Sequence, residues 1–316
     1  MSEPTDRLSK EDLERIFQEK VLPKSRLDEL TSHETPKAIV LAGQPGAGKG
    51  ALVRAAREEF RGDILVIDPD EQRERLPGVR RLQESDPFGW PKATNTDAFK
   101  LANGLRDEGI KRHVNLVIDG SMSDAGNSIR TIEALQKKGY EVEVRAISTH
   151  WLESEQGIDR RFARQIDRFG VARDVDMDFH NRVYNDLPGN MERVAEARGV
   201  QVRIYDREIN ELYDNRRDVG SPSEVLRETR TGRMEDPEVR QRLSEDWKQQ
   251  QAWHEAMPEA IRARQDISPT TAEALIAGSA ERGKLERATV RAEGIGAIDA
   301  PVQAAEPLLP RLNRAG

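Results

Sequence analysis

The chain has 316 residues, of which 34% are charged and 36% hydrophobic, and its formal net charge is −7 at pH 7. This acidic balance argues against nucleic acid as the main partner, because a phosphate backbone demands a basic surface. The absence of cysteine excludes disulfides, thiolate metal sites and a cysteine nucleophile. The N-terminus is polar and no apolar run is long enough to cross a bilayer, so we expect neither a cleaved signal nor a membrane partner.

An N-terminal helix is predicted over residues 9–20. Ser9 is a natural N-cap, acidic residues occupy the first turn, and apolar residues such as Leu13 and Phe17 recur at helical spacing. We assign residues 1–36 to an N-terminal helical segment that precedes the first strand.

The stretch LAGQPGAGKGAL, residues 41–52, has the pattern of a phosphate-binding loop. Such loops read G-x-x-x-x-G-K followed by Ser or Thr, because the glycines let backbone N–H groups surround phosphate oxygens and the hydroxyl ligates Mg²⁺. An apolar run precedes the loop and a helical pattern follows it, which is the context that the motif requires. The predicted nucleotide-binding residues are Gly43, Gln44, Pro45, Gly46, Ala47, Gly48, Lys49 and Gly50.

Five short β-rich runs alternate with helical stretches. They cover residues 37–42, 63–68, 114–120, 141–147 and 202–206. This alternation is typical of βαβ units, so we predict an α/β fold with a mostly parallel sheet flanked by helices. Ligands of such sheets bind beyond the carboxyl ends of the strands, where we expect the functional site.

Acidic residues follow two of these runs. Asp68 ends the second run, Asp70 stands just beyond it behind Pro69, and Asp119 ends the third. Because Pro69 keeps the preceding chain extended, it presents the Asp70 carboxylate at the sheet edge, where it could accept a hydroxyl proton. Each acid could instead cap a helix or belong to a turn, and for Asp68 this alternative has equal weight.

The stretch 156–188 is crowded with arginine. Cations placed over a triphosphate from a lid helix and the loop after it would act as arginine fingers supplied in cis, and the family resemblance described below singles out Arg160 and Arg173 for this role. A solvated helix face is the preferred interpretation of the other arginines, including Arg161, Arg164 and Arg168.

After residue 216 the pattern becomes that of charged helices, and we assign residues 216–316 to a helical C-terminal extension. Ser268 before Pro269 indicates a helix N-cap. Residues 294–316 are rich in Gly, Pro and Ala and are expected to be loosely ordered. One apolar stripe is expected to contain Trp247, Trp253 and Met257.

The chain resembles the zeta toxin family over residues 8–215, in segments that follow the family's order: PKAIVLAGQPGAGKG, ILVIDPDEQRERLP, NLVIDGSMSD, LQKKGYEVEVRAI, GIDRRFARQIDRFGVARDV and NDLPGNMERV. Zeta toxins of bacterial epsilon/zeta-type toxin–antitoxin systems are P-loop kinases of the 3′-hydroxyl of UDP-N-acetylglucosamine. The resemblance implies a kinase domain over residues 37–215 that uses ATP or GTP with Mg²⁺, phosphorylates this nucleotide sugar and so poisons cell-wall synthesis.

The resemblance also implies roles for individual residues. Lys49 would hold the phosphates and Asp70 would be the general base. Arg160 and Arg173 would stabilise the transferring phosphoryl group. Contacts to the sugar nucleotide would come from Asp119, Ser121 and Thr131.

Three positions depart from the family pattern. The Ser or Thr that follows the loop lysine is Gly50 here, which removes a Mg²⁺ ligand; Asp119 would then help to hold Mg²⁺, directly or through water. An arginine that the family often uses for substrate is Ser123. The acidic substrate contact expected on the helix near residues 96–104 has only Asp97 and Asn103 as candidates.

Two alternative functions stay open. The chain could phosphorylate another hydroxyl, such as that of NAD or a polynucleotide end, or it could be an inactive nucleotide-binding interaction protein, for which Gly50 is the best argument. The retention of Asp70, Arg160 and Arg173 argues against inactivity. The resemblance further implies an antitoxin or immunity protein as partner and a cytoplasmic site of action in bacteria, with delivery as a secreted effector as the alternative.

Overall fold

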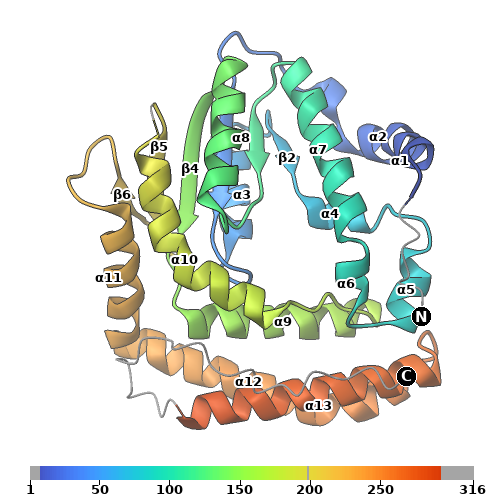
Figure 1. Cartoon of the computed structure of the whole chain (residues 1–316). Helices are drawn as coiled ribbons and strands as arrows, with labels where there is room; N and C mark the ends of the chain where they lie inside the picture. Colours follow the sequence, from blue (N-terminus) through green and yellow to red (C-terminus); the bar gives the residue numbers. More distant parts are fainter. Residues whose placement is uncertain (1–7, 198, 293–316) are drawn as a thin grey trace. The chain divides into compact units, whose positions relative to one another are not determined.

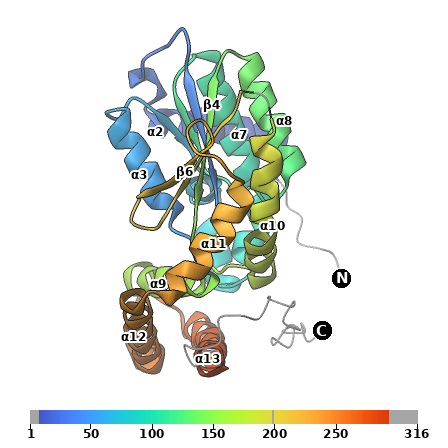
Figure 2. The same cartoon turned by 90° about the vertical axis from the view of Figure 1, so that its left-hand side faces the viewer.

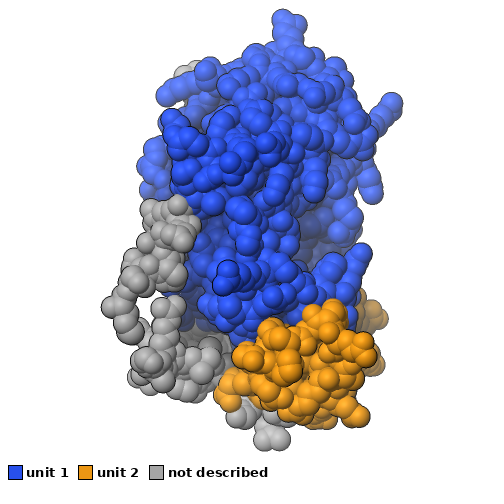
Figure 3. Space-filling model, turned by 90° about the vertical axis from the view of Figure 1, so that its right-hand side faces the viewer, with its two compact units in different colours: residues 1–230 blue, residues 231–316 orange. Residues whose placement is uncertain are grey.

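The computed structural model describes residues 8–197 and 199–292, and its chain forms two compact units, residues 1–230 and 231–316 (Figure 3). Unit 1 contains the N-terminal segment, the predicted kinase domain and, in addition, residues 216–230, which the sequence assigned to the extension. The predicted loosely ordered stretch 294–316 lies outside the described residues.

The N-terminal segment is helical, as predicted. Ser9 caps α1 (Lys10–Ile16) by accepting the backbone N–H of Asp12 at 3.0 Å. The helix continues through a π-helical turn, η1 (Phe17–Val21), into α2 (Leu22–Ser25), and a short 3₁₀ turn, η2 (Leu27–Glu29), follows. The Phe17 ring lies against Gly104, where an added Cβ would come within 3.0 Å of it. The N-terminal segment is therefore packed against α7, the helix that contains Gly104.

Unit 1 is built on a six-stranded sheet of order β2-β3-β1-β4-β5-β6. The first five strands are parallel, which confirms the predicted fold class. The sixth strand pairs antiparallel with β5 and was not predicted, because it is short and half of its residues are exposed, so it lacks the apolar run of a buried strand. The strands are β1 (Lys37–Ala42), β2 (Leu65–Ile67), β3 (Leu116–Ile118), β4 (Glu141–Ile147), β5 (Gln201–Tyr205) and β6 (Glu211–Asp214).

Helices cover both faces of this sheet (Figure 2). Ile39 and Leu41 of β1 pack toward α3 (Lys49–Glu59), whereas Ala38 and Val40 belong to the larger core on the opposite face. That opposite face is covered by α7 (Asn95–Lys111), α8 (Ala125–Lys137) and α10 (Met177–Ala195). Burial on both faces is what makes the central strands read as continuous apolar runs.

The remaining helices of unit 1 gather near the carboxyl ends of the strands. The helix α9 (Trp151–Phe169) follows β4 and lies across that end of the sheet (Figure 1). The shorter helices there are α4 (Pro69–Arg73), α5 (Val79–Ser85) and α6 (Trp90–Ala93). The helix α11 (Pro222–Glu235) begins after β6 and contains Arg230, the last residue of unit 1.

Unit 2 contains two long helices, α12 (Pro237–Arg262) and α13 (Pro269–Ala292). The predicted cap is confirmed, since Ser268 Oγ accepts the backbone N–H of Thr271 at 3.1 Å. The predicted stripe is correct for Trp247 and Met257, but Trp253 is only half-buried and is not part of it. Helical geometry places other residues on that stripe, and its buried members are Trp247, Gln250, His254, Met257 and Ile261.

No helix within residues 8–197 and 199–292 combines the length and the apolar character needed to cross a membrane.

Candidate functional site

The glycine-rich loop joins β1 to α3 and is closely covered by α9. Gly46 has a φ of +78°, and a Cβ added there would lie 1.9 Å from the carbonyl oxygen of Ser154. Reciprocally, a Cβ on Gly157 would lie 2.6 Å from the carbonyl oxygen of Gly46. Only glycine at both positions permits this approach. The helix α9 is therefore seated directly on the glycine-rich loop.

Lys49 points back into its own loop. Its Nζ donates to the carbonyl oxygen of Gly43 at 3.1 Å and lies 4.0 Å from Asp119 Oδ1. The Asp119 backbone N–H donates to Ile67 at 2.9 Å, which holds this acid at the end of β3 beside β2. Asp119 Oδ1 is buried and accepts no hydrogen bond within the described part of the chain. A buried carboxylate oxygen of this kind normally requires a donor or a cation.

Asp68 lies in the same acidic cluster. Its carboxylate caps α4 by accepting the backbone N–H of Asp70 at 2.8 Å, which is the capping role that the sequence left as the alternative. Burial, then the neighbouring charges of Asp119 and Asp70, raise the pKa of Asp68 from 3.8 to about 6. The cluster therefore carries more negative charge than its surroundings neutralise.

Asp70 is surrounded by guanidinium groups. It forms an ion pair with Arg173, and Arg73 Nε lies 3.0 Å from its Oδ1. Burial alone would raise its pKa, but the positive charges of Arg173, Arg73 and Arg161 hold the pKa of Asp70 below its ordinary value. Because 37% of the side chain is exposed, a hydroxyl could reach this ionised carboxylate.

The arginines of α9 and of the loop after it differ in their contacts. Arg173 is at the site as expected, but Arg160 donates to Gln156 Oε1 at 2.9 Å on its own helix. Arg161, which was assigned to a solvated face, has a buried Nε and Nη2 and acts electrostatically on Asp70. Arg160 and Arg161 are adjacent in sequence, so their side chains point in directions about 100° apart around the axis of α9. Because arginine occurs at so many positions of this stretch, the sequence does not indicate which face of the helix is buried.

Arg73 is a second residue that the sequence prediction missed. It is buried, and its guanidinium donates to Thr94 Oγ1 at 3.0 Å and to Asn95 Oδ1 at 2.6 Å as well as to Asp70. Its position three residues after Asp70 on a short helix was the available signal. Arg73 thereby fixes the orientation of the acid.

The predicted substrate contacts are spread over several places. Ser121 lies at the loop, because its carbonyl oxygen accepts the backbone N–H of Gly43 at 3.3 Å. Thr131 Oγ1 donates to the Asn127 carbonyl oxygen at 3.0 Å on α8.

The two candidates on α7 are engaged away from the loop. Asp97 is buried and accepts both the Leu8 backbone N–H and Lys100 Nζ at 3.1 Å, so it anchors the N-terminal segment. Asn103 is exposed and accepts Arg106 at 3.0 Å.

The site fits a nucleotide and a cation that is held mainly by phosphate oxygens. Among the described residues, no group of three or more His, Cys, Asp or Glu side chains is placed to hold a metal ion. Mg²⁺ commonly takes only one or two carboxylates and completes its shell with phosphates and water. Asp119 Oδ1 is the available oxygen. Gly50 leaves open space, since the nearest atom to an added Cβ is Arg54 Nη1 at 3.9 Å.

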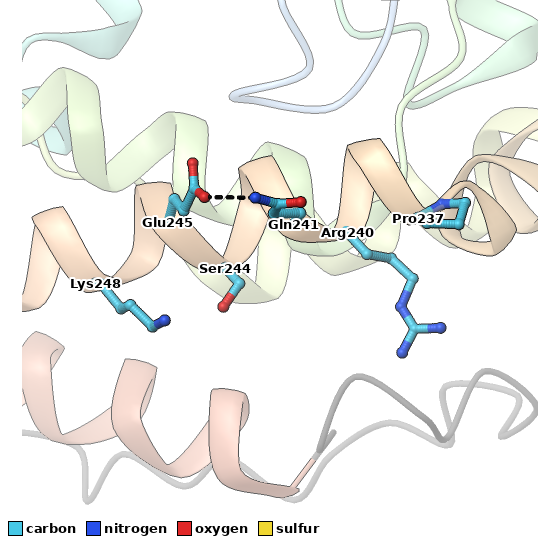
Figure 4. Close-up of a pocket in the computed structure, with 6 residues that line it drawn as sticks. All are labelled: Pro237, Arg240, Gln241, Ser244, Glu245 and Lys248. Atoms are coloured by element: carbon cyan, nitrogen blue, oxygen red, sulfur yellow. Dashed lines mark hydrogen bonds between the residues drawn. The ribbon is translucent and has the colours of Figure 1, made fainter.

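A hollow on unit 2 lies outside this site. It runs along one side of α12 and is lined by polar and charged residues, with Gln241 Nε2 donating to Glu245 Oε1 at 2.9 Å (Figure 4). None of the predicted site residues lines it. Its lining residues are Pro237, Arg240, Gln241, Ser244, Glu245 and Lys248.

Comparison with known proteins agrees with these observations. Residues 24–218 match the family model described as zeta toxin. The chain is 30% identical over 199 residues to toxin PezT of Streptococcus pneumoniae, covering 62% of this chain and 79% of PezT. It is also 30% identical over 235 residues to toxin zeta of Streptococcus agalactiae, covering 72% and 80% of the two chains. A solved structure from the S. pneumoniae PezAT chromosomal toxin–antitoxin system shares the fold, with a TM-score of 0.68 and 24% identity over 77% of this chain and 98% of that chain.

The acidic cluster leads to a prediction about stability and pH. The folded-state pKa of Asp68 lies above its ordinary value, so the folded protein binds the extra proton and loses stability as the pH rises from 3.8 towards 6. Asp68→Asn keeps an acceptor for the helix cap and removes one charge. In EDTA at pH 7.5 it should raise the free energy of unfolding by on the order of 1 to 2 kcal/mol, with little gain at pH 4.

Thermal unfolding at both pH values measures this effect. Asp124→Asn is the matched control, because Asp124 caps the exposed start of α8 and accepts the backbone N–H of Asn127 at 2.6 Å. An equal gain for Asp68→Asn at both pH values would show that charge repulsion is not the cause.

Proposed function

Because this chain belongs to the zeta toxin family, we propose that it is a P-loop phosphotransferase that moves the γ-phosphoryl group of ATP or GTP to the 3′-hydroxyl of UDP-N-acetylglucosamine. The observation that carries the proposal is the ionised Asp70, held by Arg173 and Arg73 beside the glycine loop. A positioned base and cations next to a phosphate cradle are the components that phosphoryl transfer needs.

Proton transfer in this reaction is assigned to Asp70. The acceptor hydroxyl gives its proton to the Asp70 carboxylate as its oxygen bonds to the γ-phosphorus, and the bond from that phosphorus to the bridging oxygen breaks to release the nucleoside diphosphate. A depressed pKa makes Asp70 a weak base while Arg173 is paired with it. When Arg173 turns to the negative phosphoryl group, the pKa of Asp70 rises and the carboxylate becomes a better proton acceptor.

Lys49 and the arginines of the site have different roles in binding phosphate. Lys49 would leave the Gly43 carbonyl oxygen and bind phosphate oxygens, as the lysine of a phosphate-binding loop does. Arg173 and Arg161 would stabilise charge that develops in the transition state, because both already act on Asp70 at the sheet edge. The resemblance assigns Arg160 to this role, and Arg161 is the neighbour that the geometry favours.

Mg²⁺ fits as the cation, with Asp119 as its protein ligand, directly or through water. When bound, it would neutralise phosphate charge and orient the phosphate chain. Asp119 also keeps Lys49 within 4.0 Å of its Oδ1, so the acid and the ammonium are already arranged around the space where phosphates would lie.

Family membership supports further proposals about the biological setting. The solved relative comes from a toxin–antitoxin system, so we propose that this chain also has an antitoxin or immunity protein as its partner. Its site of action would be a bacterial cytosol, where depletion of the nucleotide sugar blocks cell-wall synthesis. Another hydroxyl stays as the second candidate acceptor, because the Asp97 carboxylate anchors Leu8 and Lys100 and leaves no acidic substrate contact on that part of α7.

The direct test is a search for phosphorylated product. The full-length protein is incubated with Mg·ATP and, in separate reactions, UDP-N-acetylglucosamine, other UDP-sugars, NAD and oligonucleotides, followed by mass spectrometry. We expect UDP-N-acetylglucosamine to gain one phosphoryl group, with Lys49→Ala as the inactive control. A phosphorylated product from NAD alone would identify NAD as the acceptor in place of UDP-N-acetylglucosamine. Binding of ATP without a phosphorylated product from any acceptor would indicate an inactive nucleotide-binding protein.

Asp70→Asn should separate binding from chemistry. The amide cannot take the hydroxyl proton, so kcat should fall by roughly 10²- to 10⁴-fold while the affinity for ATP stays nearly unchanged. Steady-state kinetics and ATP titration measure the two effects. Arg164→Ala is the control on α9, because Arg164 is exposed there and should behave like the parent. An Asp70→Asn enzyme with full activity would rule out Asp70 as the base.

Gly50→Thr should lower the Mg²⁺ concentration needed for half-maximal rate. The change restores the hydroxyl ligand typical of phosphate-binding loops, and the open space around Gly50 can accept it. Rates measured against Mg²⁺ concentration for both forms check this. Gly50→Ala is the control, since it adds bulk without an oxygen. Identical Mg²⁺ dependence of all three forms would show that position 50 does not face the ion.

A further inference from the structure

A buried polar network surrounds the side chain of Gln44, the second residue of the glycine loop. Gln44 is fully buried, and its Nε2 donates to the Thr149 carbonyl oxygen at 3.0 Å and to Ser154 Oγ at 3.2 Å. Its Oε1 accepts Arg230 Nη2 at 3.3 Å. Both ends of the amide are therefore satisfied, and the acceptor end is satisfied by a residue from α11.

Arg230 is held in place by α10. Its Nη1 donates to the Tyr184 carbonyl oxygen at 2.8 Å, and its guanidinium lies 4.1 Å from the centroid of the Tyr184 ring. Arg230 is only 4% exposed, and within the described residues no carboxylate forms an ion pair with it. Burial lowers the pKa of Arg230 to about 10, so the group remains charged at neutral pH.

A buried guanidinium without a counter-charge is costly for the folded protein. An apolar residue of similar size in its place would avoid that cost but would leave Gln44 Oε1 without a donor. The buried charge of Arg230 therefore lowers the stability of the folded protein. Its hydrogen bonds join the Gln44 side chain of the loop to the Tyr184 carbonyl oxygen of α10.

The network also reaches the backbone of the loop. The Gln44 carbonyl oxygen accepts the Ala47 backbone N–H at 3.2 Å, and Thr149 Oγ1 donates to the Ala47 carbonyl oxygen at 2.9 Å. Ser154 Oγ in turn lies 2.8 Å from His180 Nε2 on α10. Fixing the Gln44 side chain thus fixes the first turn of the phosphate cradle relative to α9 and α10.

We propose that Arg230 is a positioning residue for the phosphate-binding loop, acting through the side chain of Gln44. Arg230 lies beyond residues 24–218, which match the family model, so this part of the nucleotide site is supplied by α11 of this chain. The proposal rests on the proposed function, because a loop held for nucleotide phosphates is useful only if the protein binds a nucleotide. Its positive charge also favours an anion in the neighbouring cradle.

The test is a double-mutant cycle on the full-length protein. Arg230→Met and Gln44→Met conserve side-chain size and remove the hydrogen bond from either end. Each should weaken binding of Mg·ATP by about tenfold in calorimetric titration, raising the KM for ATP more than it lowers kcat. The double variant should bind about as weakly as either single variant, because both remove the same interaction.

Arg227→Met is the matched control, since it removes the same charge from an exposed position of α11 and should bind Mg·ATP like the parent. Hydrogen exchange of the loop amides, without nucleotide, gives a second measurement. The Ala47 amide should exchange faster in Arg230→Met and not in Arg227→Met.

The possible failures are distinguishable. A parent that does not bind Mg·ATP contradicts the proposed function, while the exchange measurement still tests the positioning role. Parent-like binding or parent-like exchange in folded Arg230→Met overturns the positioning role, as do additive effects of the two substitutions. If Arg230→Met does not fold, parent-like binding by Gln44→Met overturns it instead.

Discussion

The contact between the glycine loop and α9 is the constraint on which the rest of the site depends. Gly46 and Gly157 lack the side chains that would hold the helix away from the loop, so two backbones meet where a Cβ on either would clash. This contact fixes the position of α9, and with it the positions of Arg161 on the helix and of Arg173 in the loop that follows it. The electrostatics of Asp70 follow from it, because Arg161 and Arg173 come from this helix and the loop behind it.

Charge is distributed unevenly over this site. Asp70 is stabilised as an anion by guanidinium groups, whereas Asp68 and Asp119 repel one another and Lys49 Nζ lies 4.0 Å from Asp119 Oδ1. Arg173 pairs with Asp70, Lys49 donates to a carbonyl oxygen of its own loop, and Asp119 Oδ1 accepts no hydrogen bond from any described residue. The like charges of Asp68 and Asp119 are the unfavourable pair, and such pairs lower the stability of a folded protein.

The structural unit that supports the loop extends beyond residues 24–218, which match the family model. At one end, the N-terminal segment is fixed to α7 through Leu8 and Asp97, so an acidic side chain expected at the substrate takes part in folding instead. At the other end, α11 reaches Gln44 through Arg230. Segments that carry none of the recognised motifs therefore hydrogen-bond to α7 at one end and to the glycine loop at the other.

The sequence by itself determined the α/β class, the parallel strands, the glycine loop and the helix caps at Ser9 and Ser268, and it singled out Asp70 and Arg173, which the structure brings together as an ion pair. These depend on local patterns, such as apolar runs, glycine spacing and capping residues, that keep their meaning wherever the segment lies. Only the tertiary structure decided that Arg161 faces Asp70, that Asp97 anchors the N-terminus, that β6 completes the sheet, and that Arg230 supports the loop. Each of these depends on which face of a helix or which distant segment is buried, and a charged side chain's role changes completely with the neighbours that burial gives it.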